Sequence, residues 1–322
     1  MSNPAPAIAS PLAVHTLYGQ TMGTRWRVDL LAPRVAPLDA LHGALQARLE
    51  AIEAQMSTWR EDSDLMRYNR SAPGSWHALP EDFFAVMDCA LQVAEASGGA
   101  FDPTVGALVG AWGFGAHARP GHGPSAEQLA NVRSAAGWQR LALRRGTREL
   151  LQPGGTWLDL SAIAKGHAVD ALVDLLRARG IAAALVDVGG ELRGHGRKPD
   201  GSAWRVLVEA GDVAADECVV ALDNAAIATS GPCWQRREVE GRELSHTIDP
   251  RTGAPMADAP AAVSVIAADA MHADAWSTAL CVMGVEAGLA FAQSRGLATR
   301  LLPAGAGAEA LTTAAFEACL QG

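Results

Sequence analysis

Two kinds of hydrophobic pattern alternate along the first third of the chain. Residues 14–32 alternate between apolar and polar positions and turn near Gly23, which predicts a pair of strands joined like a hairpin. Residues 38–56 carry apolar side chains at helical spacing over about five turns. A second helix is predicted from Pro80, at its first position, to the Gly98–Gly99 pair.

The rest of the chain interleaves strands and helices. Ser125 and Gln128 form a predicted capping box that opens a helix after the exposed loop 116–125. A turn and a strand are predicted in 150–160, and a helix runs from Ala164 to Gly180. Further strands are predicted in 181–190, 202–210, 219–231, 243–253, 261–267 and, as the closing strand, 297–302. A pair of helices is predicted in 269–284 and 285–296.

This order of elements predicts the fold class. Helices and strands interleave without a regular βαβ alternation, so we expect an α+β, or mixed α/β, fold with mixed sheets and packed helices. We expect a single domain over residues 15–322. The Pro/Ala/Ser-rich segment 1–14 is predicted to be a disordered tail.

Composition narrows the class of protein. The chain has 322 residues, of which 49% are hydrophobic and 19% charged, so it can bury a large core and is neither disordered nor a disulfide-stapled miniprotein. Its five cysteines are odd in number and lack a Cys-x-x-Cys pair, which favours a reducing compartment. The N-terminus has no basic residues or long apolar run, and no stretch is long enough to span a membrane. We therefore expect a cytoplasmic protein.

The charge balance excludes some partners. A formal net charge of −9 and the absence of Lys or Arg runs disfavour nucleic acid and anionic membranes. Lys165 and Lys198 are the chain's two lysines, the other basic residues being arginine. A site for an anionic ligand would therefore have to be formed by particular local residues, because the overall charge does not attract anions.

The first candidate site lies on the predicted helix 269–284. Helical spacing places Asp274 with Ser277 and Thr278 on nearly the same face, where they offer a carboxylate and two hydroxyls. Oxygen donors without clustered His or Cys suit Mg²⁺, which completes its octahedron with waters and substrate phosphates. The alternative is that these residues sit at a solvated or capped helix start.

A second candidate site surrounds the start of the helix at Ala164. Asp159 ends a predicted buried strand and Lys165 follows in the first helical turn, an arrangement that gathers N–H groups and a positive charge around an anion. It is not a Walker A loop, which needs Gly-Lys-Ser/Thr. Gly189–Gly190, after another strand, would let backbone approach a ligand. A surface lysine and an ordinary turn are the structural alternatives.

A histidine completes the candidate chemistry. His246 stands before the Asp249-Pro250 turn and could accept a proton at neutral pH, although with nine histidines in the chain a structural role is the alternative. Gly-x-Ser-x-Gly and His-Glu-x-x-His are absent, which disfavours serine hydrolases and zinc peptidases. A cation site, a lysine at a helix start and glycine backbone without side chains are together suited to binding a nucleotide pyrophosphate.

A series of motifs runs in order along residues 18–290, approximately: QTMGTRW, MSTWREDSDLMRYNR, GGAFDPTVGALVGAWGFG, LDLSAIAKGHAVD, LVDVGGELRGHG, IATSG, SHTIDPRTG and DAMHADAWSTAL. Together and in this order they resemble the ApbE family of FAD:protein FMN transferases. The resemblance implies an enzyme that joins the FMN half of FAD through a phosphoester to a Thr or Ser of an acceptor flavoprotein, with Mg²⁺ and release of AMP.

The resemblance also implies roles for individual residues. The flavin or adenine pocket would be lined by Met22, Trp59, Ala100, Phe101 and Asp102, with Asp159 and Lys165 also on the FAD. The metal would be held by the backbone carbonyl of Ala162 and by Asp274, Ser277 and Thr278. His246 resembles the family's candidate base, and Asp274 and His246 are thus the predicted catalytic residues.

Some features depart from the family, and some activities stay open. Pro232-Cys233-Trp234 follow IATSG where members often have an acidic or aromatic residue, and no lipobox cysteine lies near the N-terminus. An Mg²⁺-dependent FAD pyrophosphatase that releases FMN and AMP would use the same metal site. A non-catalytic FAD-binding protein and a flavin oxidoreductase are further alternatives, although no nicotinamide site is apparent.

Overall fold

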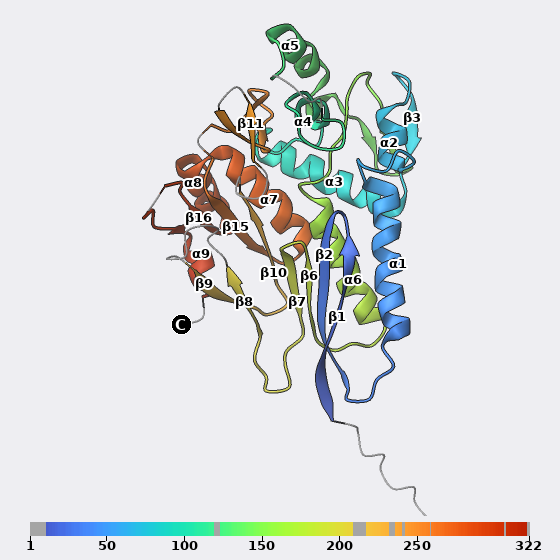
Figure 1. Ribbon diagram of the computed structural model, residues 1–322, viewed down its shortest axis with the longest axis vertical. Coiled ribbons are helices and arrows are strands. Elements are labelled where there is room, and N and C mark those ends of the chain that lie inside the picture. Colours follow the sequence, from blue (N-terminus) through green and yellow to red (C-terminus); the bar gives the residue numbers. More distant parts are fainter. Residues whose placement is uncertain are drawn as a thin grey trace, which may run out of the picture.

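The centre of the fold is an eight-stranded antiparallel sheet. The computed structural model describes residues 11–118, 123–208, 217–231, 236–239, 242–257, 259–305 and 307–320. The sheet has the order β1-β2-β6-β7-β10-β15-β16-β17, with every neighbouring pair antiparallel (Figure 1). Its strands are β1 (Leu12–Thr21), β2 (Thr24–Pro33), β6 (Ala184–Val188), β7 (Glu191–His195), β10 (Ala226–Ser230), β15 (Ala262–Ala267), β16 (Ala298–Leu302) and β17 (Leu311–Thr312).

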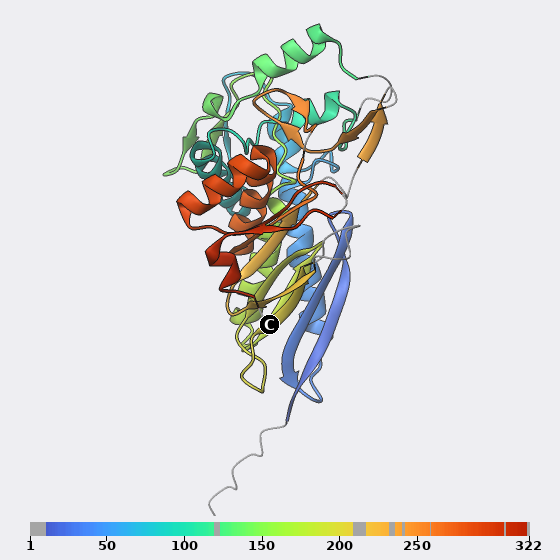
Figure 2. The same cartoon turned by 90° about the vertical axis from the view of Figure 1, so that its left-hand side faces the viewer.

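Helices cover one face of this sheet. α1 (Asp39–Met56) packs along β1, α6 (Ala164–Ala178) packs on β6 and β7, and α7 (Ala270–Met283) packs on β10 and β15 (Figure 2). The alternation in β2 turns Trp26, Val28 and Leu30 into the core beneath the helices, where each is at most 1% exposed. α8 (Val285–Arg295) follows α7 and packs on β16.

The opposite face is covered by a second, smaller layer. β8 (Trp204–Val208) and β9 (Cys218–Leu222) form a hairpin whose buried valines and Leu222 pack against Ile227 and Ile266 of the sheet. α9 (Ala314–Glu317) adds the fully buried Phe316 to this cluster. The sheet is therefore buried on both faces over much of its width.

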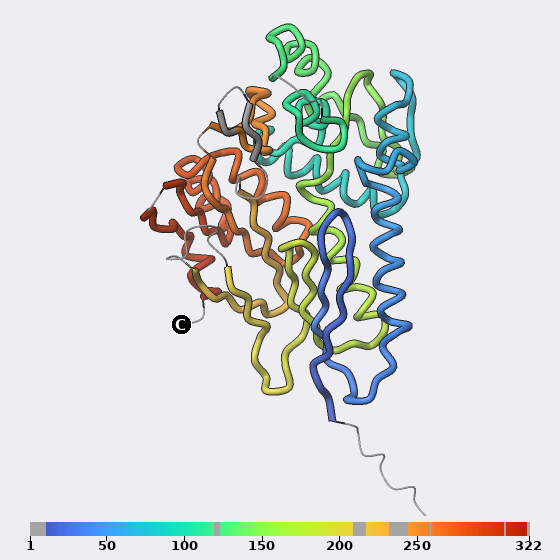
Figure 3. Tube along the Cα trace, in the orientation of Figure 1, coloured from blue at the N-terminus to red at the C-terminus, as the bar shows by residue number. Residues whose placement is uncertain are grey.

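A cap of helices and short strands lies at one end of the sheet, as the trace in Figure 3 shows. It contains α2 (Asp64–Asn69), α3 (Glu81–Ala96), α4 (Gly106–Ala111), α5 (Ala126–Ala135), η1 (Trp138–Arg140), and the small sheet of β3 (Trp76–Ala78), β4 (Leu143–Arg144) and β5 (Glu149–Leu151). Two small hairpins join it, β11 (Arg236–Val239) with β12 (Arg242–Ser245) and β13 (Ile248–Asp249) with β14 (Ala254–Pro255).

The expected α+β class is confirmed, as are most of the predicted elements. The capping box of Ser125 and Gln128 is present in both directions. Other details differ: β7 and the cap elements α2, α4, β3 and β4 lie outside the predicted segments, and the strand expected to end at Asp159 is a single bridge at Trp157. Residues 12–14 belong to β1 because they pair with β2, Pro80 is the N-cap and α3 begins after it, and the chain continues past β16 into β17 and α9. The last two elements are too short to leave a periodic pattern. Residues 1–10 lie outside the described residues.

The crossing of α6 and α7 depends on a glycine. A Cβ on Gly166 would lie 2.2 Å from the carbonyl oxygen of Ala270, so the two helices approach too closely for any side chain there. We expect Gly166→Ala to lower the free energy of unfolding by about 1–3 kcal/mol, because the backbone of α7 must move.

Urea denaturation measures this effect, and Gly43→Ala is its control. Gly43 lies in α1 with open space around its Cβ position, so alanine there should stabilise the protein by about 1 kcal/mol or less through helix propensity. Equal effects of the two substitutions would contradict the close crossing.

Candidate active site

The segments around Ala162 and Asp274 meet where α6 and α7 cross. The N–H of Gly166, in the first turn of α6, donates to Asp274 Oδ2 at 3.0 Å. The first N–H groups of a helix have no partner within it, so Asp274 caps α6 from another helix. The Gly166 N–H thus donates to Asp274. It does not donate to the carbonyl of Ala162, four residues earlier, as it would within a regular helix.

Hydroxyl groups extend this oxygen cluster toward strand β10. The Ser230 hydroxyl lies 2.8 Å from Ser277 Oγ and 2.9 Å from Thr278 Oγ1. Ser277 is fully buried and also donates to the carbonyl of Asp274 at 2.8 Å, whereas Thr278 is half-buried. Because Ser277 is fully buried, Thr278 is the more accessible of the two hydroxyls.

Lys165 and Glu191 form an ion pair beside Asp274, in which Glu191 is buried and Lys165 is half-buried. Lys165 Nζ lies 2.5 Å from Glu191 Oε1, and the Glu191 side chain is 3% exposed. Burial opposes the charged form of Lys165, but the charges of Glu191 and Asp274 outweigh it and raise its pKa. Burial raises the pKa of both Glu191 and Asp274, with the Lys165 charge acting in the opposite direction. The three groups therefore interact electrostatically.

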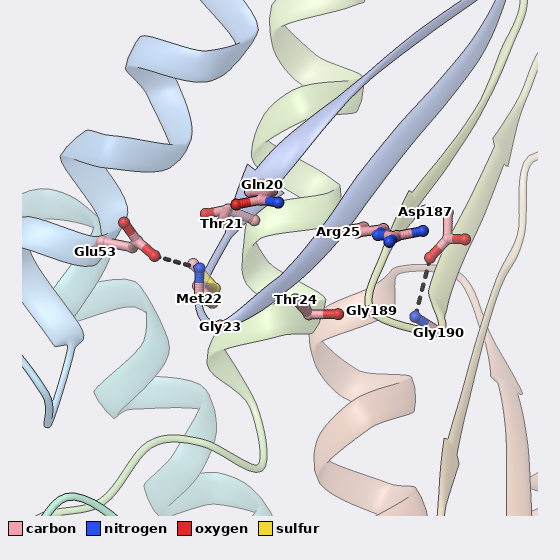
Figure 4. Close-up of a pocket in the computed structure, with 10 residues that line it drawn as sticks. All are labelled: Gln20, Thr21, Met22, Gly23, Thr24, Arg25, Glu53, Asp187, Gly189 and Gly190. Atoms are coloured by element: carbon pink, nitrogen blue, oxygen red, sulfur yellow. Dashed lines mark hydrogen bonds between the residues drawn. The ribbon is translucent and has the colours of Figure 1, made fainter.

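A cavity of about 690 Å³ opens at the tip of the β1–β2 hairpin (Figure 4). Met22 and Gly23 both have positive φ, 49° and 70°, as a two-residue turn between antiparallel strands requires. The N–H of Met22 donates to Glu53 Oε1 of α1. Across the cavity lie Asp187 and the Gly189–Gly190 turn, which directly precedes Glu191. The cavity therefore opens at the turn next to the Lys165 partner.

The other predicted FAD residues lie in the cap. Trp59 is 74% exposed, in the loop after α1. The side chains of Ala100, Phe101 and Asp102 are buried, and Asp102 accepts hydrogen bonds from Thr104 and from the Trp138 N–H at 2.7–3.0 Å. Burial raises the pKa of Asp102. Any contact of this segment with a ligand would therefore use its backbone.

Asp159 connects this segment to the start of α6. Its N–H donates to the Pro103 carbonyl at 2.9 Å, and its Oδ1 accepts the Ser161 N–H at 2.8 Å. The predicted FAD segment 100–102 thus lies close to the turn that contains Ala162. Met22 lies at the tip of the β1–β2 hairpin and Trp59 in the loop after α1, so the predicted residues come from several separate parts of the chain.

His246 is half-buried in the short connection between β12 and β13. The turn that follows it is attached to the rest of the protein by hydrogen bonds from Arg251 Nη2 to the Val282 carbonyl of α7, from Trp112 Nε1 to the Gly253 carbonyl and from Arg133 Nη2 to the Arg251 carbonyl. This turn therefore contacts the helix that carries Asp274. The Pro232-Cys233-Trp234 departure lies outside the described residues.

His272 has a structural explanation. Its Nδ1 lies 2.7 Å from Asp269 Oδ1, and Asp269 caps α7 by accepting the His272 N–H. The hydrogen bonds with Asp269 and Cys89 raise the pKa of His272 to about 10. His272 is therefore charged at neutral pH and cannot accept a proton there.

Sequence reasoning did not single out Glu191, Ser230 or Glu53. Glu191 and Ser230 stand inside motifs already quoted, LVDVGGELRGHG and IATSG, and an acidic residue directly after the Gly-Gly pair was the available signal for Glu191. Glu53 occupies an ordinary polar position of a surface helix. No sequence pattern distinguishes it, because its role depends on where the hairpin tip lies.

The donor set fits a hard divalent cation. The described residues contain no group of three or more His, Cys, Asp and Glu side chains arranged around a metal position. A cation here would instead meet one buried carboxylate, a hydroxyl and a backbone carbonyl, and Mg²⁺ accepts such sparse oxygen sites because it keeps waters and shares substrate phosphates. Among the helices in the described ranges, none has the length and apolar character needed to cross a membrane.

Comparisons with known proteins agree on one family. The model of the ApbE family matches residues 22–301. An FAD:protein FMN transferase of Klebsiella pneumoniae (strain 342) is 36% identical over 300 residues, covering 91% of this chain and 86% of that protein. The transferase of the same name from Escherichia coli (strain K12) is 35% identical over 304 residues, covering 93% and 87%.

Solved structures show the same likeness. The apo crystal structure of the flavinyl transferase ApbE from Pseudomonas stutzeri is 38% identical and superposes with a TM-score of 0.88, covering 96% of this chain and 97% of that one. The flavin transferase ApbE from Vibrio cholerae is 32% identical, with a TM-score of 0.87 and coverage of 96% and 100%.

Proposed function

The chain belongs to the ApbE family, and from that premise we propose that it is an FAD:protein FMN transferase. The substrates are FAD and an acceptor flavoprotein. The hydroxyl oxygen of a Thr or Ser of the acceptor forms a bond to the FMN-side phosphorus, the bond from that phosphorus to the bridging oxygen breaks, and AMP leaves. The hydroxyl proton passes to a base on the enzyme.

One observation carries this proposal, namely the 3.0 Å hydrogen bond from the Gly166 N–H to Asp274. It brings Asp274, with Thr278 and Ser277 on the same helix, next to the turn of Ala162. These four residues would hold Mg²⁺, with Asp274 and Thr278 the most directly available. When bound, the ion neutralises charge on the pyrophosphate and on the departing AMP.

The remaining predicted residues would bind FAD. Lys165 would add a positive charge to the phosphates from the first turn of α6, and Asp159 would contact the FAD from the turn before it. Met22, Trp59 and the backbone of 100–102 would line the flavin or adenine pocket. The positive φ of Met22 and its hydrogen bond to Glu53 support a defined position for this residue.

His246 would accept the proton of the acceptor hydroxyl. It lies in a connection whose following turn is tied to α7 through Arg251, and it is half-buried. An imidazole that titrates near neutral pH suits this role.

Mass spectrometry of an acceptor protein tests the proposed reaction. Incubation with FAD, Mg²⁺ and a candidate flavoprotein should add the mass of FMN to the acceptor, and replacement of its target Thr by Ala should prevent the addition. Free FMN and AMP in the absence of any acceptor would indicate an FAD pyrophosphatase instead. Stoichiometric bound FAD without AMP release under either condition would indicate a carrier. A cytoplasmic location remains a prediction from the sequence.

Substitution of Lys165 tests the FAD site. Lys165→Met should weaken FAD binding roughly 10-fold to 100-fold, because hydrogen bonds to charged groups contribute about 1.5–3 kcal/mol. Quenching of flavin fluorescence on binding measures the affinity. Lys198→Met is the matched control, since Lys198 is the other lysine of the chain and lies over the Trp204 ring, 5.5 Å from its centroid. Equal affinities of the two variants would reduce Lys165 to a structural residue.

A further inference from the structure

The Lys165 ammonium has two buried acidic neighbours, and it is bonded to one of them. Nζ contacts Glu191 Oε1 at 2.5 Å, whereas Asp274 acts on Lys165 through its charge and directs Oδ2 to the Gly166 N–H. Glu191 is 2% exposed and Asp274 is 3% exposed. Lys165 is thus held by the carboxylate of β7 rather than by that of α7.

The charges of this trio do not cancel. When all three groups are ionised, two carboxylates face one ammonium, and a buried excess charge is unfavourable unless another group compensates it. Because Glu191 holds the ammonium, the uncompensated negative charge is that of Asp274. A divalent cation at Asp274 would remove the imbalance.

Glu191 has a feature that packing alone does not explain. Its second oxygen, Oε2, is buried and has no hydrogen-bond partner within the described residues. An unpartnered buried carboxylate oxygen costs stability, and the Lys165 ion pair uses only Oε1. The function of this acidic side chain is therefore to be sought in its contact with Lys165.

We propose that Glu191 is a positioning residue that holds the Lys165 ammonium off Asp274 and thereby keeps Asp274 available to a divalent cation. A direct Lys165–Asp274 ion pair would neutralise the carboxylate and compete with the cation for its oxygens. This inference rests on the proposed function, because it takes Asp274 as the cation ligand. It assigns to Glu191 no contact with FAD or with the cation.

Glu191→Gln removes the charge and keeps the size of the side chain. Lys165 then has one anionic neighbour fewer and should turn to Asp274. We expect the Mg²⁺ concentration for half-maximal FMN transfer to rise at least about 10-fold, while the KM for FAD changes less than threefold. Mn²⁺ binding to the protein without FAD, followed by water proton relaxation, should weaken by a similar factor.

A double-mutant cycle separates this role from a general structural effect. In a Lys165→Met background no ammonium competes for Asp274, so adding Glu191→Gln should leave the Mn²⁺ affinity unchanged. Glu191→Asp keeps the charge and should restore most of the Mn²⁺ affinity lost in Glu191→Gln. Thermal melting of each variant shows whether it is folded. If Glu191→Gln alone unfolds, the test uses Glu191→Asp and the two proteins that carry Lys165→Met, with and without Glu191→Gln.

The outcomes are distinguishable. Equal weakening by Glu191→Gln in both backgrounds, or no weakening in either, would overturn the inference while leaving FMN transfer intact. If the unsubstituted protein transferred FMN without any dependence on a divalent cation, or did not transfer it at all, the proposed function itself would fail.

Discussion

Replacing Asp274 with asparagine should lower the rate of FMN transfer at saturating FAD by at least about 100-fold. Asparagine keeps the size of the side chain and an oxygen that can accept the Gly166 N–H, so α6 and α7 should stay together. It loses the one buried carboxylate of the oxygen cluster, and charge stabilisation by a bound cation contributes several kcal/mol to such reactions. The rate is measured as FMN attached to the acceptor over time, across a range of Mg²⁺ concentrations.

The control for Asp274→Asn is Asp269→Asn on the same helix. Asp269 caps α7 through the His272 N–H, and asparagine is an equally good N-cap residue, so transfer should change less than about threefold. Both variants should melt near the temperature of the unsubstituted protein. Transfer by Asp274→Asn at the normal rate and with the normal Mg²⁺ requirement would show that the metal assignment is wrong.

Replacing His246 with glutamine should lower the rate of transfer by about 10²–10⁴-fold, the usual contribution of a general base. The KM for FAD should stay within threefold, because the role of His246 concerns the acceptor hydroxyl. The loss should be largest at neutral pH, and the variant should lack the rise in rate on the acidic side that deprotonation of a histidine produces. A pH profile of kcat over pH 5–9 measures both.

His272→Gln is the matched control for the histidine. The hydrogen bonds with Asp269 and Cys89 raise the pKa of His272 to about 10, so its imidazole stays protonated below that pH and cannot serve as the base near neutrality. Its removal should leave the acidic side of the profile in place. A profile that changes in His272→Gln and stays unchanged in His246→Gln would transfer the assignment of the base away from His246.

Local patterns carried the prediction of the helices and of the oxygen cluster. Helical periodicity places Asp274, Ser277 and Thr278 on one side of α7, and the structure has that helix from Ala270 to Met283. The same periodicity found α1 and α6, and alternation found the β1–β2 hairpin. The error at residues 12–14 arose because composition suggested a frayed segment, whereas pairing with β2 over the whole length of β1 orders these residues.

Local sequence patterns could not predict the contacts between segments that are distant in the chain. Glu191 meets Lys165, 26 residues away in the chain, because β7 lies beneath α6, and Ser230 meets Thr278 because α7 packs on β10. Which strand lies beneath which helix depends on the strand order of the sheet. Neither spacing nor composition specifies that order, because it results from the packing of the whole core.

The sequence by itself determined which residues could carry the chemistry, since the period of each element decides which side chains share a face. It also determined the α+β class and the family to which the chain belongs. Only the tertiary structure decided that the Ala162 and Asp274 segments touch, because that contact requires a helix crossing close enough to exclude a side chain at Gly166. It alone decided, too, that Lys165 is bonded to Glu191, since the pairing of buried charges depends on distances that no single segment contains.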